Sequence, residues 1–414
     1  MRPASNLSRP KVFGSTGGGV DPGRRQPIRP CRPVERQDEV SGANALRSKV
    51  QTINREFVEP SVVTAGRFQA EEPFGIPDIS RQSAREAVVH AVRMSRTGGP
   101  EVLEWVEVPD PKPGDGQALV AVEAVGVNFL EIYRRTGLYQ IPLPAVPGSE
   151  LAGTVLAVGP GAGGIAVGDR VATVDAPGAY AEQAVVPVDR LVPIPDPVSC
   201  EDAAAAMVQG MTAQYLVTDT FLLEPGQRCL VHAAAGGVGL LLVQLAHQVG
   251  AEVFATVGSS AKAELARSAG ADHVIVPAEQ EFVAAVEAIA GPRPLDVVYD
   301  GVGKDTFAGG LSLLRRRGMM VTFGNASGAV DPISPLVLMS NGSLFLTRPL
   351  LFDYIASSSD LHARAEDVLS RIADGTLAMR IGARYPLAQA AQAHSLLESR
   401  QSTGKIILGV ARDS

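Results

Sequence analysis

The sequence predicts an α/β protein that combines a parallel, doubly wound sheet with an all-β region of the barrel type. Three observations predict this fold class. A strand, a glycine turn, a helix and a second strand follow one another over residues 228–257. Strands and helices then alternate up to residue 349. Before residue 208, short strands are separated by turns rich in Pro and Gly, which is typical of all-β architecture.

The composition indicates more than one folded core. A chain of 414 residues exceeds the size at which a single hydrophobic core keeps growing, so two domains and an extension are expected. The net charge of −7 leaves no basic surplus for a polyanion, and nucleic acid is not expected as the main partner. No apolar run is long enough to span a membrane or to act as a secretory signal. The expected compartment is therefore the cytoplasm.

The three cysteines point to a reducing compartment. Cys31, Cys200 and Cys229 form no Cys-x-x-Cys pair, and an odd number without a regular framework argues against disulfides and a structural zinc site. Cys229 opens a predicted buried strand, where we expect it to pack as a small apolar residue.

The first part of the chain differs from the rest. Residues 1–86 are rich in Arg, Pro, Ser and Gly and show no hydrophobic period, which predicts a disordered extension. A transit peptide and a start codon assigned too far upstream are both open explanations of this segment. The folded body is expected to begin near Val88. Strands are predicted at 88–92, 103–108, 118–127 and 180–188.

The glycine turn between residues 231 and 240 is the most informative motif. Its sequence, Ala233-Ala234-Ala235-Gly236-Gly237-Val238-Gly239, is an Ala-x-Gly-x-x-Gly variant of the dinucleotide-binding fingerprint. Gly236 lets the backbone approach a pyrophosphate, and Gly239 lets the helix pack closely on the strand. The helix N-terminus then presents its N–H groups to the phosphates. The complete strand–helix–strand context predicts a nucleotide-binding fold.

The remaining elements follow from the same rhythm. Helices are predicted at 261–269 and 282–290, and strands at 273–276, 295–299, 318–323 and 344–347. After Pro349, the predicted order is a helix at 360–373, a strand region at 378–385, a helix at 387–399 and a strand at 405–410. We infer that this tail packs back on the β-region. The predicted domains are therefore 87–208, 209–349 and 350–414, the last being the return of the first.

Several motifs resemble one protein family. Asn128-Phe129-Leu130-Glu131-Ile132-Tyr133 and Pro147-Gly148-Ser149-Glu150-Leu151-Ala152-Gly153 resemble the catalytic domain of the medium-chain dehydrogenase/reductases. The motifs at 233–239, 323–328 and 346–349 look like the zinc-independent, NADPH-dependent quinone oxidoreductases, the zeta-crystallin-like branch. The resemblance covers residues 88–410. It implies a GroES-like β-barrel catalytic domain, a Rossmann domain with a doubly wound parallel sheet, and a cleft between them.

The resemblance also bears on the chemistry. Asn128 and Ser149 stand where zinc-dependent relatives hold a catalytic metal with Cys and His, and neither is a plausible zinc ligand, so no metal is predicted. Without a Lewis acid, such an enzyme is suited to passing a hydride to an electron-poor quinone or enone. The implied activity is NADPH:quinone oxidoreductase. Two alternatives stay open: reduction of the C=C bond of enals or enones, and an NADPH-binding protein with an RNA-binding or structural role.

The resemblance places Asn128, Tyr133 and Tyr139 beside the acceptor. Tyr133 is the candidate hydrogen-bond donor to the developing oxyanion. Tyr139 is either a second site residue or an aromatic side chain that fills a loop. Glu131 is expected to be an exposed acid rather than a proton carrier, and His232 a strand-end residue rather than a catalyst.

The cofactor prediction depends on the end of the second strand of the nucleotide unit. NAD-selective proteins place an acid there for the ribose 2′-OH, and this chain has Gly258-Ser259-Ser260-Ala261-Lys262 instead. Two hydroxyls and an ammonium suit a 2′-phosphate, so NADP(H) is the predicted cofactor. By the resemblance, Lys262 binds the 2′-phosphate. A solvated Lys262 behind an N-cap at Ser259 is the alternative.

The resemblance implies the other cofactor contacts and a homodimer. Arg400 either reaches the cofactor or is solvated, and the sixth strand would join the sheets of two subunits. Pro277 replaces a family Tyr that supports the 2′-phosphate, so the preference for NADPH over NADH is expected to be modest. Gln209 replaces a common Lys, and this loss of charge is expected to alter the affinity for the cofactor or the acceptor. The further implied cofactor residues are Gly237 and Val238 at the pyrophosphate, Gly324 and Asn325 near the nicotinamide, Phe345 and Thr347 at the carboxamide, and Phe129.

Overall fold

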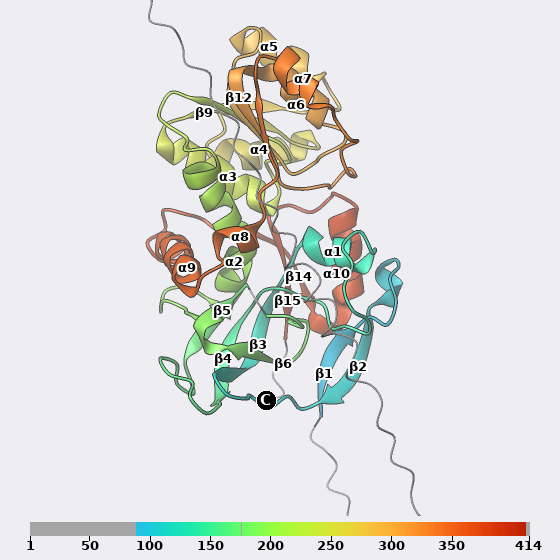
Figure 1. Ribbon diagram of the computed structural model, residues 1–414, viewed down its shortest axis with the longest axis vertical. Helices are drawn as coiled ribbons and strands as arrows, with labels where there is room; N and C mark the ends of the chain where they lie inside the picture. Colours follow the sequence, from blue (N-terminus) through green and yellow to red (C-terminus); the bar gives the residue numbers. More distant parts are fainter. Residues whose placement is uncertain (1–87, 175, 411–414) are drawn as a thin grey trace, which may run out of the picture. The chain divides into compact units, whose positions relative to one another are not determined.

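The computed structural model describes residues 88–174 and 176–410 (Figure 1). The extension predicted for residues 1–86 lies outside the described residues. In the described part of the chain, the strands form one two-stranded sheet, one six-stranded sheet and one seven-stranded sheet.

The β-domain contains the seven-stranded sheet and the separate antiparallel pair β1–β2. Its strands are β1 Val88–Arg93, β2 Glu104–Pro109, β3 Gln117–Val127, β4 Leu151–Val158, β5 Arg170–Thr173, β6 Gln183–Pro187, β7 Val192–Pro193, β14 Ile381–Pro386 and β15 Lys405–Gly409. Along one side of the long β3, β6 pairs with the first half and β15 with the second. The C-terminal strand therefore completes a sheet that the N-terminal strands begin.

The predicted barrel is not closed among the residues that the structure describes. The path β14-β15-β3-β4-β5-β7 has two ends that do not pair with each other. One end is the two-residue β7. The pair β1–β2 forms its own sheet and meets the rest of the domain through an isolated bridge between Ala91 and Ala181. The GroES-like prediction is corrected in this respect from a barrel to an open, curled arrangement.

Within residues 176–410, six parallel strands form the doubly wound sheet that the sequence predicts, in the order β10-β9-β8-β11-β12-β13. They are β8 Arg228–Val231, β9 Glu252–Thr256, β10 His273–Ile275, β11 Leu295–Asp300, β12 Leu314–Thr322 and β13 Phe345–Thr347. The helices between them are α3 Gly237–Val249, α4 Ser260–Ser268, α5 Phe282–Ala290, α6 Phe307–Leu313 and α7 Pro335–Ser340.

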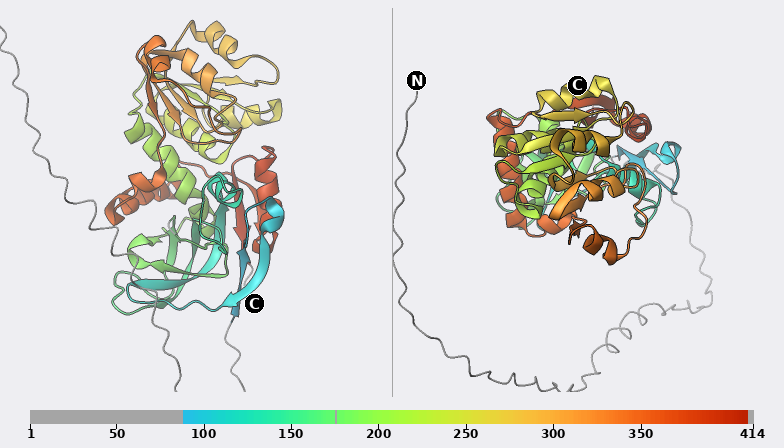
Figure 2. Two further views of the ribbon diagram at one scale, coloured as in Figure 1. Left: turned by 45° about the vertical axis from the view of Figure 1, so that its right-hand side comes forward. Right: turned by 90° about the horizontal axis from the view of Figure 1, so that it is seen from above.

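Alternation along the strands creates two hydrophobic layers, and helices cover both faces (Figure 2). In β9, Val253 and Ala255 pack in the cluster that includes Leu241 of α3. Phe254, which points to the opposite face, packs in the cluster that includes Val286 of α5. Cys229 in β8 is fully buried, as predicted.

The helix α2, Cys200–Tyr215, is absent from the sequence predictions and crosses the predicted boundary at residue 208. It contacts α3 of one domain and β3, β5 and β15 of the other. A helix that is buried on several sides loses the amphipathic period by which a sequence reveals it. A π-helical turn, Leu216–Thr220, continues it. The other helices are α1 Phe129–Arg135, α8 Leu351–Tyr354, α9 Ser358–Ala373 and α10 Ala390–Glu398.

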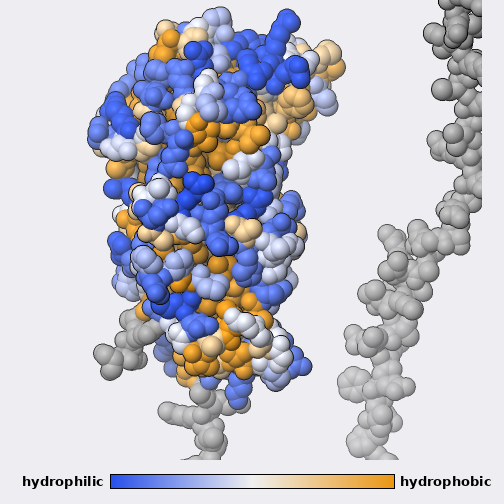
Figure 3. All heavy atoms as spheres, turned by 90° about the vertical axis from the view of Figure 1, so that its left-hand side faces the viewer, coloured by the Kyte–Doolittle hydropathy of each residue, from blue (hydrophilic) through white to orange (hydrophobic). Residues whose placement is uncertain are grey.

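Figure 3 shows one face of the molecule, where hydrophilic side chains surround small apolar patches. Among the residues that the structure describes, no helix is long and apolar enough to cross a membrane.

Candidate active site

A cavity of about 970 Å³ lies at the carboxyl ends of the parallel strands. Loops after all six strands contribute to its lining, which is where α/β sheets bind ligands. The opposite wall comes from the β-domain, at residues 127–130, 133–134 and 139–141. The cavity corresponds to the cleft expected between the two domains.

Most of the predicted site residues line this cavity. Those that do are Asn128, Phe129, Tyr133, Tyr139, Gly236, Gly237, Val238, Gly239, Gly258, Lys262, Gly324 and Arg400. Five are not part of the lining, namely Ser259, Ser260, Asn325, Phe345 and Thr347. Asn325 nevertheless contacts a lining residue, because its backbone N–H bonds to Tyr133. Phe345 lies at the sheet edge and is 52% exposed.

The glycine turn has the geometry that the fingerprint predicts. Gly236 is the N-cap of α3 and has no side chain with which to satisfy the first N–H groups of the helix. A Cβ on Gly239 would overlap the carbonyl oxygen of Ala233, so close packing requires glycine there. Ala233 itself has φ of +52°. The N-terminus of α3 therefore opens into the cavity with unsatisfied donors, which suits a pyrophosphate.

Tyr133 presents a hydroxyl whose oxygen already accepts one hydrogen bond. The backbone N–H of Asn325 donates to it at 2.8 Å. Burial raises the pKa of the Tyr133 phenol, against the opposing effects of this N–H and of the Arg348 charge, so the phenol stays protonated. Tyr139 packs edge-on against the Tyr133 ring, with centroids 5.4 Å apart. The Tyr133 hydrogen is thus available to an acceptor in the cavity.

Arg348 is a site residue that the sequence predictions do not include. It lines the cavity, and its Nη1 donates to Thr322 Oγ1 at 3.1 Å and to the Gly324 carbonyl at 2.9 Å. These bonds hold a guanidinium near the Tyr133 hydroxyl. Its position directly after the sixth strand could have identified it, since ligands of such sheets bind at the carboxyl ends of the strands.

Asn128 is fixed by a buried ion pair. Its Oδ1 accepts from Lys405 Nζ at 2.7 Å, and its Nδ2 donates to Glu150 Oε1 at 2.7 Å. Lys405 and Glu150 also pair with each other, and both side chains are fully buried. The other Glu150 oxygen accepts the N–H of Val208 at 2.6 Å. Both ends of the Asn128 amide are therefore oriented from behind the cavity wall.

Glu131 is buried, so the expectation of an exposed acid is wrong. One carboxylate oxygen accepts the Asn128 N–H at 2.9 Å in a capping box at the start of α1. The other accepts Ser149 Oγ at 2.8 Å, and Arg134 donates to that hydroxyl at 2.9 Å. Burial raises the pKa of Glu131, while the Ser149 hydrogen bond opposes the rise. Glu131 thus anchors α1 and Ser149 rather than facing solvent.

His232 directly follows β8 and lines the cavity. Its Nδ1 lies 2.8 Å from Thr256 Oγ1, and its ring meets that of Phe282 edge-on, with centroids 5.1 Å apart. Burial lowers the pKa of His232 to about 4, so the imidazole is neutral near pH 7. This environment agrees with the prediction of a strand-end residue.

Lys262 connects the nucleotide domain to the last loop of the chain. Its ammonium donates to the carbonyls of Arg400 at 2.7 Å and Ser402 at 2.9 Å. Burial lowers the pKa of Lys262. Ser259 occupies the N-cap position of α4, but its side chain makes no capping bond. The alternative of a solvated lysine behind a Ser259 cap therefore does not describe this site.

Two polar side chains modify the expected cofactor environment. Ser260 Oγ hydrogen-bonds to Glu279, which belongs to the loop after β10. An acid thus stands near the end of the second strand, although the sequence places none there. Gln209 lies against Gly237 in the cavity, and its Oε1 is buried without a hydrogen-bond partner among residues 88–174 and 176–410.

Comparison with known proteins agrees with this geometry. The model of the alcohol dehydrogenase GroES-like domain matches residues 114–196, and that of the zinc-binding dehydrogenase matches residues 237–372. A quinone oxidoreductase of Salmonella typhimurium is 42% identical over 77% of this chain and 98% of its own length. The chain belongs to the quinone oxidoreductase family.

Other members of this family and its neighbours extend the comparison. The crystal structure of Escherichia coli quinone oxidoreductase complexed with NADPH has a TM-score of 0.75 and 40% identity, covering 77% of this chain and 99% of that one. A 2-haloacrylate reductase of Burkholderia sp is 40% identical over 78% of this chain and 99% of its own length. Both a quinone reductase and an alkene reductase are thus similar to this family member.

Proposed function

We propose that this protein is a zinc-independent NADPH:quinone oxidoreductase. The observation that carries the proposal is the Tyr133 hydroxyl, which faces the cavity with its oxygen held by the Asn325 N–H at 2.8 Å. NADPH, when bound, supplies a hydride from its nicotinamide ring. A quinone that takes up this hydride and one proton from water becomes a hydroquinone. NADPH complexes of similar quinone oxidoreductases support the choice of cofactor.

Most of the residues proposed to hold NADPH line the cavity. Gly236, Gly237, Val238 and Gly239 offer the donors at the start of α3 to the pyrophosphate. At the adenosine end, Lys262 binds the 2′-phosphate with Gly258, Ser259 and Ser260, and Arg400 flanks it. At the other end, Phe129 and Gly324 would border the nicotinamide together with the adjoining Asn325. The predicted carboxamide contacts of Phe345 and Thr347 would have to come from just outside the lining, through the backbone of β13.

On the acceptor side, the site stabilises negative charge that develops on a quinone oxygen. Tyr133 donates its hydroxyl, and Arg348 adds a fixed positive charge next to it. Asn128 and Tyr139 complete the wall, and the buried ion pair behind Asn128 keeps that wall rigid. A preorganised donor and charge are sufficient here, because the quinone delocalises the incoming charge.

The test is NADPH oxidation, followed by absorbance, with 1,4-benzoquinone and separately with an enal, after chelator treatment. Rapid oxidation with the quinone supports the proposal and its independence of metal. Turnover of the enal alone would assign the protein to alkene reduction, for which the 2-haloacrylate reductase provides precedent. Tight NADPH binding without consumption of either acceptor would favour a non-catalytic role.

The protein also has an edge suited to homodimer formation. β13 is the last strand of the parallel sheet, and Phe345 and Leu346 on it are exposed. Leu336 and Met339 of the neighbouring α7 are exposed as well. Pairing of two β13 strands would cover these side chains and join the sheets. Sedimentation velocity should show a dimer that Leu346→Lys dissociates; a monomeric wild type would contradict this.

The cytoplasmic location of the protein stays a prediction.

A further inference from the structure

The short helix α8 forms one wall of the acceptor end of the cavity. Leu351 and Phe352 of α8 line the cavity together with Leu350, and Tyr215 at the end of α2 lines it nearby. Four residues make a single helical turn, which does not hold itself in place. The position of this wall is therefore determined by the groups that hold α8 from behind.

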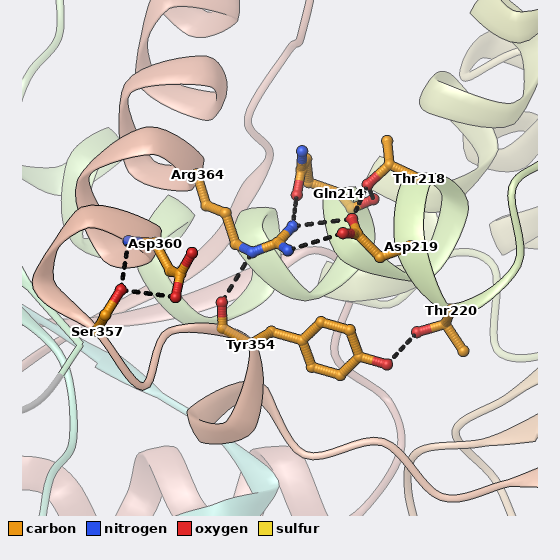
Figure 4. A network of polar contacts seen from close by, with 8 residues as sticks. All are labelled: Gln214, Thr218, Asp219, Thr220, Tyr354, Ser357, Asp360 and Arg364. Carbon is orange, nitrogen blue, oxygen red and sulfur yellow. Dashed lines mark hydrogen bonds and ion pairs between the residues drawn. The ribbon is translucent and has the colours of Figure 1, made fainter.

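A single guanidinium joins α8 to two other elements (Figure 4). The Nε of Arg364 in α9 donates to the Tyr354 carbonyl of α8 at 2.9 Å. Its two terminal nitrogens donate to the two carboxylate oxygens of Asp219, both at 3.0 Å. Nη1 also donates to Gln214 Oε1 at 2.6 Å. The bidentate pair gives a fixed geometry, because the planar fork of Arg matches a carboxylate.

The side chain of Tyr354 is held at its ring and at its hydroxyl. The ring stacks on Tyr215 with centroids 4.0 Å apart and planes 10° from parallel. The hydroxyl lies 2.8 Å from Thr220 Oγ1, and the Arg364 guanidinium lies 5.6 Å from the ring centroid. Because Tyr215 also faces the cavity, this stack transmits the position of Tyr354 to a second lining residue.

The partners of Arg364 are presented by a π-helical turn. Asp219 and Thr220 belong to the turn Leu216–Thr220 that ends α2, and such turns are frequent at functional sites. The start of α9 is fixed by Ser357, whose hydroxyl accepts the Asp360 N–H at 3.1 Å (Figure 4). Both sides of the Arg364–Asp219 pair are thus built on ordered helix ends.

We propose that Arg364, Asp219 and Tyr354 form a clamp that positions the α8 wall and thereby sets the size of acceptor that the site takes. These three are positioning residues, since none of them lines the cavity. The inference rests on the proposed quinone reductase function. The hydrogen bonds of the clamp join α8 and α9 to α2 and its π-helical turn, whereas Lys262 bonds to the loop at residues 400–402. Loss of the clamp should therefore alter acceptor selection and leave NADPH binding unchanged.

The experiment compares Arg364→Met with the control Arg371→Met. Arg371 belongs to the same helix and pairs with Asp367 at 2.9 Å, one turn away, without contact to α8. The values of kcat/KM for 1,4-benzoquinone, 1,4-naphthoquinone and 9,10-phenanthrenequinone are measured, with NADPH affinity determined by fluorescence. Arg364→Met should shift the ratio for the largest over the smallest quinone by about tenfold, the scale of pocket-fit effects. Arg371→Met should match the wild type.

Tyr354→Phe is the second variant, in case Arg364→Met fails to fold. It removes the bond to Thr220 and keeps the ring stack, so a smaller shift in the same direction is expected. A wild-type size ratio in a folded Arg364→Met or Tyr354→Phe protein would overturn the clamp. An equal loss of NADPH affinity would overturn it too, since that indicates general loosening. Failure of the wild type to reduce any of these quinones would instead overturn the proposed function.

Discussion

The hydroxyl of Tyr133 is the group on which the proposed chemistry depends most directly. Replacement by Phe removes the donor while keeping the ring that Tyr139 packs against. We expect Tyr133→Phe to lower kcat by roughly 100-fold, the effect of losing one oxyanion donor, with little change in NADPH affinity. Because burial raises the pKa of this phenol, its contribution should be constant from about pH 6 to 9. Stopped-flow hydride transfer measures this directly, and an unchanged kcat would exclude Tyr133 as the donor.

The second prediction for a single residue concerns Lys262. Lys262→Ala should raise the KM for NADPH about tenfold more than the KM for NADH, because a charge-assisted hydrogen bond to the 2′-phosphate is lost. The ratio of the two KM changes is the informative quantity. Lys262 also donates to the carbonyls of Arg400 and Ser402, and losing these two bonds should affect the KM for both cofactors equally. Lys112→Ala, at an exposed loop position of the β-domain, is the control. Equal effects on the two cofactors would remove Lys262 from the 2′-phosphate role.

Single residues also show where sequence reasoning stops. The fingerprint glycines and Tyr133 were found because local motifs identify them. Lys405 was not, since it reaches Asn128 across 277 positions of sequence and no local pattern records such a contact. Glu279 was missed for the same reason: it meets Ser260 through the proximity of two loops, not through the end of the second strand.

At the scale of elements, the helices that could be predicted are those whose apolar residues recur with a helical period. The sequence places α5 at 282–290, and the structure has it at Phe282–Ala290. The prediction succeeded because the helix is amphipathic on the surface of the sheet. By contrast, α2 passes between the two sheets and is buried over much of its length, notably at Ala203–Ala206. Its apolar residues therefore do not gather on one face of the helix, and the predicted domain boundary at residue 208 falls in its middle.

The strand β3 depends on a glycine for the buried ion pair behind Asn128. A Cβ at Gly126 would overlap the Glu150 carboxylate and lie 2.7 Å from Lys405 Cε. We expect Gly126→Ala to reduce the free energy of unfolding by about 1–3 kcal/mol, as overpacking of a core does. Urea denaturation measures the change. Gly409→Ala is the matched control, because Gly409 lies on the adjoining β15 with open space around its missing side chain. Equal stabilities of the two variants would contradict the argument.

At the scale of the described chain, the C-terminal return links the two domains at the cofactor site. The Gly404 N–H donates to the Ala235 carbonyl at 2.9 Å, so the loop before β15 is joined to the glycine turn. Lys262 bonds to the same loop from α4. A dinucleotide bound at the glycine turn would therefore lie next to the contacts that join the two domains, namely Gly404 with Ala235 and Lys262 with Ser402.

The fold class of the described chain could be predicted from the order of its elements. The open path of the β-domain could not, because a pattern of strands in the sequence does not show which sheet edges pair.

Two buried histidines make the stability of this fold dependent on pH. Burial lowers the pKa of His232 to about 4 and that of His394 to about 3, below the usual 6.5. Above pH 6.5, both are neutral in the folded and unfolded states, so neither affects stability. As the pH falls below 6.5, the unfolded chain takes up protons that the folded protein does not. The free energy of unfolding should then fall by about 1.4 kcal/mol per pH unit for each histidine, until the pH reaches the folded-state pKa.

His394→Gln isolates one of these contributions. Gln retains a polar partner for Tyr180, whose hydroxyl lies 3.0 Å from His394 Nε2, but it takes up no proton. Urea denaturation of the variant between pH 7 and pH 5 should therefore show a shallower loss of stability than the wild type, whereas His247→Gln, at an exposed position, should follow the wild type. Carboxylates contribute equally to all three proteins in this range, so the difference in slope belongs to the histidine. Parallel curves for His394→Gln and the wild type would show that His394 takes up its proton as readily in the folded protein as in the unfolded chain.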